Sequence, residues 1–223
     1  SVLSLLFEKL DPEIPIVIAV GFKSHLIKEY IELVHPELNV TFVDVDNYEE
    51  EGSGPGYSLL QCKTELLCPF VLLNCDSYIE EKIPVPDKNW MGVTTVLTAN
   101  PYCTLGLQDG QVKAIFDKKS YDQIAESHYE PDDALNNAFT GIAGIFDYEN
   151  FWEGFDSNTS LKDGELQVSN GFESLIKKNM EVKRFASWLD TGTGKSYKKA
   201  LEKIGPDQVL LKQVGIYWKN NLE

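Results

Sequence analysis

The apolar run Ile16-Val17-Ile18-Ala19-Val20 stops at Gly21 and is followed by a helical pattern over residues 24–34. Uninterrupted apolar runs of this length are typical of strands buried on both faces of a parallel sheet. Residues 40–45 and 70–75 repeat the strand pattern, and a glycine-rich turn with a predicted helix lies between them. This alternation predicts an α/β fold: a Rossmann-like, doubly wound, mostly parallel mixed central sheet flanked by helices.

The pattern changes from Trp90 onward, where apolar runs are joined by short turns such as Asp109-Gly110. This half is therefore expected to be more antiparallel. We predict strands at 91–97, 103–107, 112–116 and 139–146 and helices near 148–155, 169–178 and 196–204, whereas the apolar segment 209–218 has no periodicity that assigns it to either class. We interpret residues 1–223 as a single domain.

Composition excludes several classes of partner. The chain has 20 Lys and Arg against 35 Asp and Glu, a formal net charge of -15, which disfavours nucleic acid. No apolar stretch approaches the roughly 20 residues of a membrane span, so we predict a cytoplasmic protein without membrane contact. A phosphate-bearing ligand would need local cations, backbone N–H groups or a divalent metal to overcome the negative field.

The four cysteines form no C-x-x-C pair, and the three histidines are scattered, so we expect reduced thiols and no structural zinc.

Two aspartates are candidate metal ligands. Asp76 follows the apolar run 70–75, at the strand end where open α/β sheets bind ligands. Asp190 follows Trp188-Leu189 and precedes a glycine turn into a predicted helix. Facing each other, they would suit Mg²⁺, which takes one or two protein carboxylates and leaves other positions to water and phosphates. The alternatives are a turn-forming Asp76 and an Asp190 that caps the helix near Ser196.

Three further motifs are similar to known ligand-binding or metal-binding motifs. The loop Gly52-Ser53-Gly54-Pro55-Gly56 precedes a predicted helix, and its missing Cβ atoms would let a ligand approach the backbone. Asp44 and Asp46 resemble the metal-binding D-x-D of glycosyltransferases. The segment 192–196 resembles the end of a P-loop, but Leu189 stands where that motif needs its first glycine, so the P-loop interpretation fails.

Several stretches, in this order, resemble the nucleotidyltransferases that activate sugar phosphates and choline phosphate with a nucleoside triphosphate. They are GSGPGYSLLQC (52–62), PFVLLNCDS (69–77), KAIFDKK (113–119), FTGIAGIFDY (139–148), GELQVSN (164–170) and WLDTGT (188–193). The likeness covers roughly residues 1–200 and implies a GT-A-like sheet. It also implies a Mg²⁺-dependent transfer of a nucleotidyl group to a sugar phosphate or similar phosphate ester, with release of pyrophosphate.

The resemblance also implies roles for individual residues. Asp76 and Asp190 would hold Mg²⁺, Lys118 would neutralise the acceptor phosphate, and Gly54 and Gly56 would pass close to the nucleobase. Thr140, Gly141 and Glu165 would contact the acceptor. The product would be a nucleoside-diphosphate-sugar, of the kind used in polysaccharide biosynthesis.

The sequence departs from the family pattern at its start. The family's leading strand and its phosphate-binding loop, Gly-x-Gly-Thr-Arg with a downstream Pro-Lys, are expected before Ser1 and are absent from this sequence. Cys75 also stands where the family has glycine. Two alternatives stay open: a glycosyltransferase that uses Asp44 and Asp46, and a non-catalytic paralogue that binds a nucleotide sugar. The nucleobase, the acceptor and the oligomeric state are left open.

Overall fold

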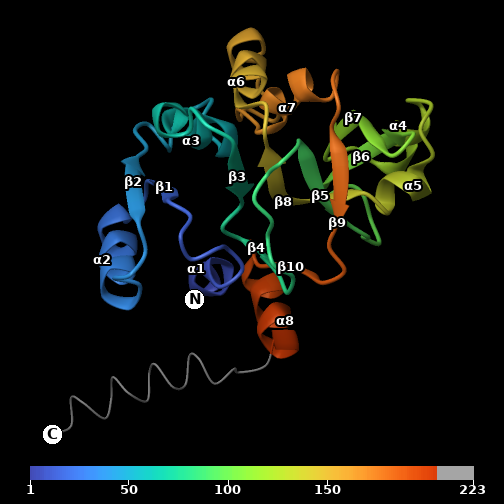
Figure 1. Ribbon diagram of the computed structural model, residues 1–223. Helices are drawn as coiled ribbons and strands as arrows, with labels where there is room; N and C mark the ends of the chain where they lie inside the picture. The colour runs from blue at the N-terminus through green and yellow to red at the C-terminus, as the bar shows by residue number, and fades with distance from the viewer. Residues whose placement is uncertain (205–223) are drawn as a thin grey trace, which may run out of the picture.

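The computed structural model describes residues 1–204, so the apolar segment 209–218 lies outside the described residues. A six-stranded sheet forms the centre, in the order β3-β8-β5-β9-β7-β6 (Figure 1). Its strands are β3 (Phe70–Leu73), β5 (Trp90–Thr94), β6 (Cys103–Gln108), β7 (Gln111–Asp117), β8 (Ala138–Ile145) and β9 (Glu181–Arg184).

The sheet is mixed. The prediction of a mostly parallel sheet is wrong, because most neighbouring strands run antiparallel. β8 runs antiparallel to both β3 and β5, and β7 runs antiparallel to both β9 and β6. β5 and β9 form a parallel pair. Because β8 is inserted between β3 and β5, these two strands point the same way without touching, a relation that apolar runs in the sequence do not encode.

A separate parallel pair, β1 (Ile16–Val20) and β2 (Val40–Asp44), is joined by helix α2 (Ser24–Val34). This unit lies beside β3 in Figure 1. Among the described residues, β1 has no partner on the edge away from β2, and β3 has none on the edge away from β8. Ile16 on β1 and Val71 and Leu73 on β3 nevertheless pack against one buried cluster, formed by Leu10, Ile79, Ile83, Trp90, Ile142 and Phe185.

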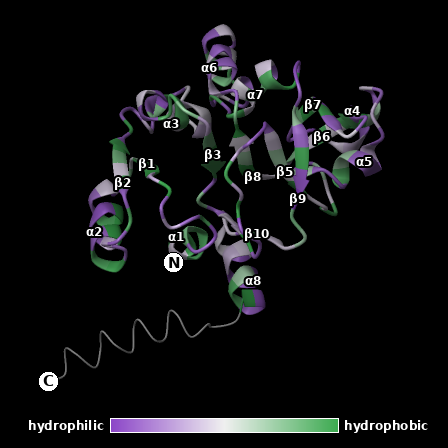
Figure 2. Ribbon diagram, viewed as in Figure 1, coloured by the Kyte–Doolittle hydropathy of each residue, from purple (hydrophilic) through white to green (hydrophobic). Residues whose placement is uncertain are grey.

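The main hydrophobic core lies between the six-stranded sheet and two helices, α6 (Tyr148–Ser157) and α7 (Ser169–Leu175). Phe151 and Phe172 are at most 1% exposed and meet edge to face at 5.4 Å. The prediction of buried faces on both sides of β1 fails, since residues 16–18 are only half-buried and Ala19 is exposed. Figure 2 shows hydrophobic residues along β1 and α2, and Phe22 and Leu33 there are 63% and 73% exposed.

The remaining elements are short. They are α1 (Val2–Phe7), α3 (Pro55–Gln61), the 3-10 turn η1 (Lys63–Glu65), β4 (Ser77–Ile79), α4 (Tyr121–Ala125), α5 (Pro131–Leu135), β10 (Trp188–Asp190) and α8 (Gly194–Ile204). Strands β4 and β10 pair with each other, antiparallel, outside the central sheet. Within residues 1–204, no helix is both long and apolar enough to cross a lipid bilayer.

Candidate functional site

Asp76 lies in a turn that joins β3 to β4, not at the last position of β3 as the sequence predicts. β3 ends at Leu73, and the turn is closed by the Ser77 N–H, which donates to the Asn74 carbonyl at 3.2 Å. The Asp76 side chain is exposed. The turn thus carries Asp76 beyond the carboxyl-terminal end of β3, which is the expected side of the sheet.

Asp190 is brought to Asp76 by the β4–β10 pair, in which Asp190 lies opposite Ser77. The connection is tightened by Thr191, whose N–H and hydroxyl both donate to the Asp76 carbonyl at 2.7 Å. Asp190 does not cap α8, because Thr193 and Ser196 exchange hydrogen bonds at the start of that helix. Instead, Asp190 Oδ1 accepts from the Gly192 N–H at 2.8 Å.

The two carboxylates converge at Gly192. A Cβ atom placed on Gly192 would lie 2.8 Å from Asp76 Oδ2 and 3.3 Å from Asp190 Oδ1. Glycine therefore leaves open a space that borders one oxygen of each carboxylate. Two hard oxygen donors beside an open space fit Mg²⁺, which completes its coordination with water and substrate phosphates. The described residues contain no group of three or more acidic, His or Cys side chains that would form a closed metal cage.

The pKa of the Asp76 carboxyl is raised. Although the side chain is exposed, partial desolvation by the surrounding chain is the main cause, and the negative charge of Asp190 adds to it. A backbone hydrogen bond opposes the shift without cancelling it. A bound cation would relieve both causes, because it favours the ionised form of each carboxylate.

Tyr102 connects the carboxylate pair to Lys118 and was missed by the sequence analysis. Its ring meets Trp188 edge to face at 5.4 Å, and burial, with a smaller contribution from the charge of Asp190, raises the pKa of its hydroxyl. Its carbonyl accepts from the Lys118 N–H at 3.1 Å. The Lys118 side chain is exposed at the end of β7. Only a contact across the fold distinguishes Tyr102 from other tyrosines, so no sequence signal points to it.

The glycine-rich loop packs against residues 164–167. A Cβ atom on Gly56 would lie 2.6 Å from the carbonyl of Gln167, and one on Gly54, whose φ is 137°, would lie 2.9 Å from Glu165 Cβ. The Gly56 N–H donates to the Leu166 carbonyl at 2.9 Å. These glycines are therefore required by a contact within the chain. Their contact with a nucleobase stays a prediction.

The three residues predicted to contact the acceptor each have a contact within the protein. Thr140 is 1% exposed, and its hydroxyl donates to the Gly92 carbonyl at 3.1 Å. Gly141, with φ of 78°, makes room for the Asn74 side chain, 2.8 Å from the position that a Cβ would take. Glu165 is exposed and accepts from Gln167 Nε2 at 2.9 Å. Their contacts with an acceptor stay predictions.

A cavity of about 110 Å³ is lined in part by residues that are close in sequence to Asp76, Tyr102 and Lys118. It is lined by Pro55, Asn74, Met91, Cys103, Asp117, Phe139, Gln167, Val168, Ser169 and Phe172. Asn74 precedes Asp76 by two residues, and Cys103 and Asp117 adjoin Tyr102 and Lys118. Three short segments, residues 74–76, 102–103 and 117–118, thus contribute both to the lining of the cavity and to the candidate site around the carboxylate pair. No sequence pattern assigns a role to Asp117, although it stands directly before Lys118.

Asp44 and Asp46 have partners within the protein. Asp44 accepts from Lys28 Nζ at 2.7 and 2.8 Å, and Asp46 accepts from the Tyr57 hydroxyl at 2.6 Å. A D-x-D metal site would have to break both contacts.

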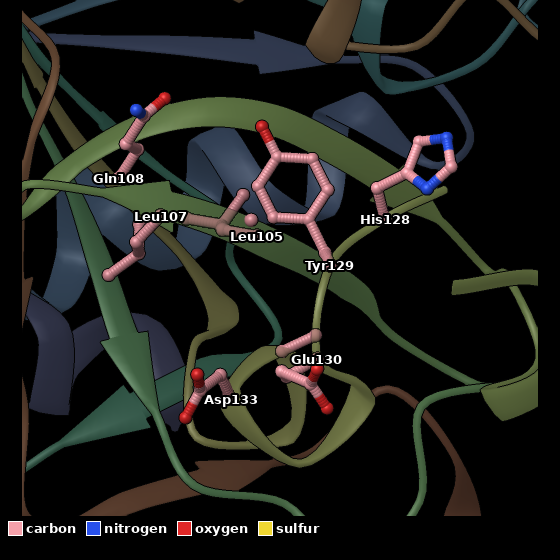
Figure 3. A pocket seen from close by; sticks show the side chains of 9 residues that line it. Leu105, Leu107, Gln108, His128, Tyr129, Glu130 and Asp133 are labelled. Atoms are coloured by element: carbon pink, nitrogen blue, oxygen red, sulfur yellow. The ribbon is translucent and has the colours of Figure 1, made fainter. Parts of the chain in front are cut away.

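A second cavity, about 390 Å³, is a groove between β6 and α5 that none of the predicted site residues lines. Figure 3 shows Tyr129 over the strand and the carboxylates of Glu130 and Asp133 at the rim. Both carboxylates are exposed, and the groove shares no lining residue with the smaller cavity.

No protein-family model matches the chain, and no curated protein matches its sequence. Solved structures do match. A UDP-glucose pyrophosphorylase complexed with UDP-glucose has a TM-score of 0.66 at 15% identity, covering 85% of this chain and 80% of that one. A putative glucose-1-phosphate thymidylyltransferase from Bacillus anthracis has a TM-score of 0.63 at 16% identity, covering 88% and 78%.

CTP:phosphocholine cytidylyltransferase from Streptococcus pneumoniae has a TM-score of 0.61 at 19% identity, covering 91% of this chain and 82% of that one. At these identities the matches establish the fold. The predicted resemblance is therefore confirmed at that level: this chain has a fold similar to that of the sugar-phosphate and choline-phosphate nucleotidyltransferases.

Proposed function

We propose that this protein is a nucleotidyltransferase. It would transfer a nucleoside monophosphate from a nucleoside triphosphate to a sugar phosphate or similar small phosphate ester, with release of pyrophosphate; a sugar phosphate acceptor would give a nucleoside-diphosphate-sugar. The observation that carries the proposal is the convergence of Asp76 and Asp190 on the space left open by Gly192. The fold shared with enzymes of this class supports it.

The proposed chemistry needs alignment and charge neutralisation more than a reactive side chain. An acceptor phosphate oxygen attacks the α-phosphorus in line, and pyrophosphate leaves. Asp76 and Asp190 would hold Mg²⁺, which would neutralise charge that develops on the phosphates. Lys118, exposed and free of any ion pair among the described residues, would hold the acceptor phosphate.

The free edges of β1 and β3 suit one further strand. The resemblance predicts a leading strand with a phosphate-binding loop before Ser1, and we propose that this strand pairs between β1 and β3. Its loop would then lie near the turn that carries Asp76. The half-buried apolar residues of β1 support the proposal, since a covering strand would remove them from water.

The glycosyltransferase alternative is not favoured, because Asp44 and Asp46 are already engaged by Lys28 and Tyr57. A non-catalytic paralogue would keep the same carboxylate pair. An activity assay therefore has to distinguish this hypothesis from that of an active enzyme.

The test is pyrophosphate release by the native gene product, with Mg²⁺ and a panel of nucleoside triphosphates and acceptor phosphates. We expect release with at least one pair of substrates, and Asp44→Asn should leave it unchanged within about twofold. Nucleotide-sugar binding without any release would establish the non-catalytic paralogue. Transfer or hydrolysis of a ready-made nucleotide sugar, abolished by Asp44→Asn, would establish the glycosyltransferase.

A further inference from the structure

The small cavity contains one carboxylate, and that carboxylate is already neutralised. Asp117 Oδ2 accepts from Lys162 Nζ at 2.8 Å and from the Ser169 hydroxyl at 2.6 Å. Lys162 Nζ also donates to Ser169 Oγ at 3.0 Å, which closes a triangle of polar groups. The Asp117 side chain is 20% exposed and the Lys162 side chain 33% exposed, so water screens this ion pair only in part.

The direction of the Asp117 pKa agrees with this geometry. Burial alone would raise the pKa, but hydrogen bonds from Lys162 and Ser169 and the charge of Lys162 hold it below its ordinary value. Cys103, also in the cavity wall, has a pKa raised well above its ordinary value by burial and by Asp117, so its thiol is neutral. The cavity therefore contains an ionised but paired carboxylate and no unpaired charge among its lining residues.

We propose that Lys162, by pairing with Asp117, makes this cavity select an uncharged, hydroxyl-bearing acceptor group, a sugar, over a quaternary ammonium group. The proposal rests on the proposed function and decides between two classes of acceptor that it leaves open.

A quaternary ammonium group has no hydrogen-bond donor, and it is held by an unpaired carboxylate or by the faces of aromatic rings. Asp117 is not unpaired. The two aromatic rings that line the cavity, Phe139 and Phe172, pack edge to face on each other at 5.7 Å, and Phe172 is 1% exposed. The lining thus offers no unpaired carboxylate, and the packing of its two rings on each other and the burial of Phe172 leave little aromatic surface for a cation.

A sugar meets suitable partners. Asn74, Gln167 and Ser169, which carry amide and hydroxyl groups, line the cavity beside Asp117. Gln167 uses its Nε2 on Glu165, which leaves its carbonyl oxygen to accept from a ligand hydroxyl. Met91 and Val168 provide apolar contact for the C–H face of a sugar ring.

The test is calorimetric binding to the native gene product, with Mg²⁺ and the probes phosphocholine and glucose, galactose and mannose 1-phosphates. All four probes carry a phosphomonoester, so differences in affinity come from the other half of the molecule. We expect at least one hexose 1-phosphate to bind at least tenfold more tightly than phosphocholine. Lys162→Gln keeps an N–H donor for Asp117 and removes the charge. It should reduce the ratio of the dissociation constant of phosphocholine to that of the hexose 1-phosphate at least tenfold.

Lys162→Arg should keep the ratio, because it keeps the charge. The matched control is Lys88→Met, which removes an exposed lysine that pairs with Glu181 at 2.6 Å outside the cavity lining. It should also keep the ratio. The proposal is overturned if phosphocholine binds as tightly as every hexose 1-phosphate, if no hexose 1-phosphate binds, or if Lys162→Gln leaves the ratio unchanged. Faster pyrophosphate release from a nucleoside triphosphate with phosphocholine as the acceptor than with any hexose 1-phosphate would overturn the proposed sugar selectivity but support the nucleotidyltransferase activity.

Discussion

The surroundings of Asp76 make its negative charge unfavourable for folding. The same charge can bind a cation. Desolvation and the neighbouring charge of Asp190 raise its pKa above the ordinary value of an unfolded aspartate. A group with a raised folded-state pKa favours the folded state below its unfolded pKa, and this contribution is lost as the pH rises through the folded pKa. At neutral pH, without a cation, Asp76 therefore lowers the stability of the protein.

Asp76→Asn is accordingly expected to raise the melting temperature slightly at pH 7 without Mg²⁺. The gain should disappear as the pH falls below the pKa of an unfolded aspartate, because the wild-type carboxyl is then protonated too. Differential scanning fluorimetry across pH measures both effects. A lower melting temperature for the variant at pH 7 would show that Asp76 stabilises the fold.

Gly192 offers a way to disturb the site without removing a ligand. In Gly192→Ala the new Cβ lies 2.8 Å from Asp76 Oδ2, the end of a side chain that can rotate away, so stability should change little. Displaced carboxylates should still lower any Mg²⁺-dependent activity at least about tenfold, since small misplacements at reacting centres are costly. Gly194→Ala is the matched control, because its Cβ meets nothing within 4 Å. Equal activity of the two variants would contradict a metal site at Gly192.

At the scale of elements, the contact between the glycine-rich loop and residues 164–167 holds the start of α3 in place. In Gly56→Ala the new Cβ lies 2.6 Å from backbone atoms of Gln167, which cannot move independently. We expect the free energy of unfolding to fall by about 1–3 kcal/mol, the usual cost of overpacking. Urea denaturation measures it, again with Gly194→Ala as control. An unchanged midpoint would show that the two segments separate easily.

The free edge of β1 is testable by amide hydrogen exchange. Ile16 N–H donates to Asn39 and the Val20 carbonyl accepts from Val45, so Ile16, Ile18 and Val20 face β2, and Val17 and Ala19 face the open edge. In this 223-residue chain, Val17 and Ala19 should exchange faster than Ile18 and Val20. In a native product with a leading strand, their exchange should slow. Equal protection of all four residues in this chain would contradict an open edge.

The elements that the sequence predicts well are those defined by local pattern. β1 and α2 match their predicted bounds because a glycine separates an apolar run from a helical period. Strands β4, β9 and β10 were not predicted, because each has three or four residues and is defined by a distant partner. The short helices α4 and α5 were also missed, since they carry too few turns to show a period.

The candidate site was predicted unevenly for the same reason. Asp76 and Asp190 could be chosen because each follows an apolar run, but their convergence depends on the pairing of β4 with β10. The loop glycines were predicted to admit a ligand, which stays a prediction, and the structure adds a separate reason for them, since a Cβ on Gly54 or Gly56 would collide with residues 165–167. Asp117, Lys162 and Ser169 meet across 45 and 52 positions of sequence, so no local pattern could reveal their triangle.

At the scale of the whole molecule, a formal charge of -15 surrounds a site proposed to bind phosphates. Such a field opposes the approach of a triphosphate at long range, and salt screens it beyond roughly 8–10 Å. Local groups must then supply the attraction. Here Lys118 and a cation at Asp76 and Asp190 would do so, which is why the carboxylate pair is central to the account.

The measurement that tests this most directly is Mg²⁺-dependent pyrophosphate release by the native gene product, compared with its Asp76→Asn and Asp190→Asn variants. Asp156→Asn, which removes an exposed partner of Lys63, is the matched control. We predict that each site variant loses at least about a hundredfold in rate, as expected when electrostatic stabilisation is removed, and that the control keeps its rate. Rates in the site variants equal to that of the control would contradict the proposed role of this carboxylate pair.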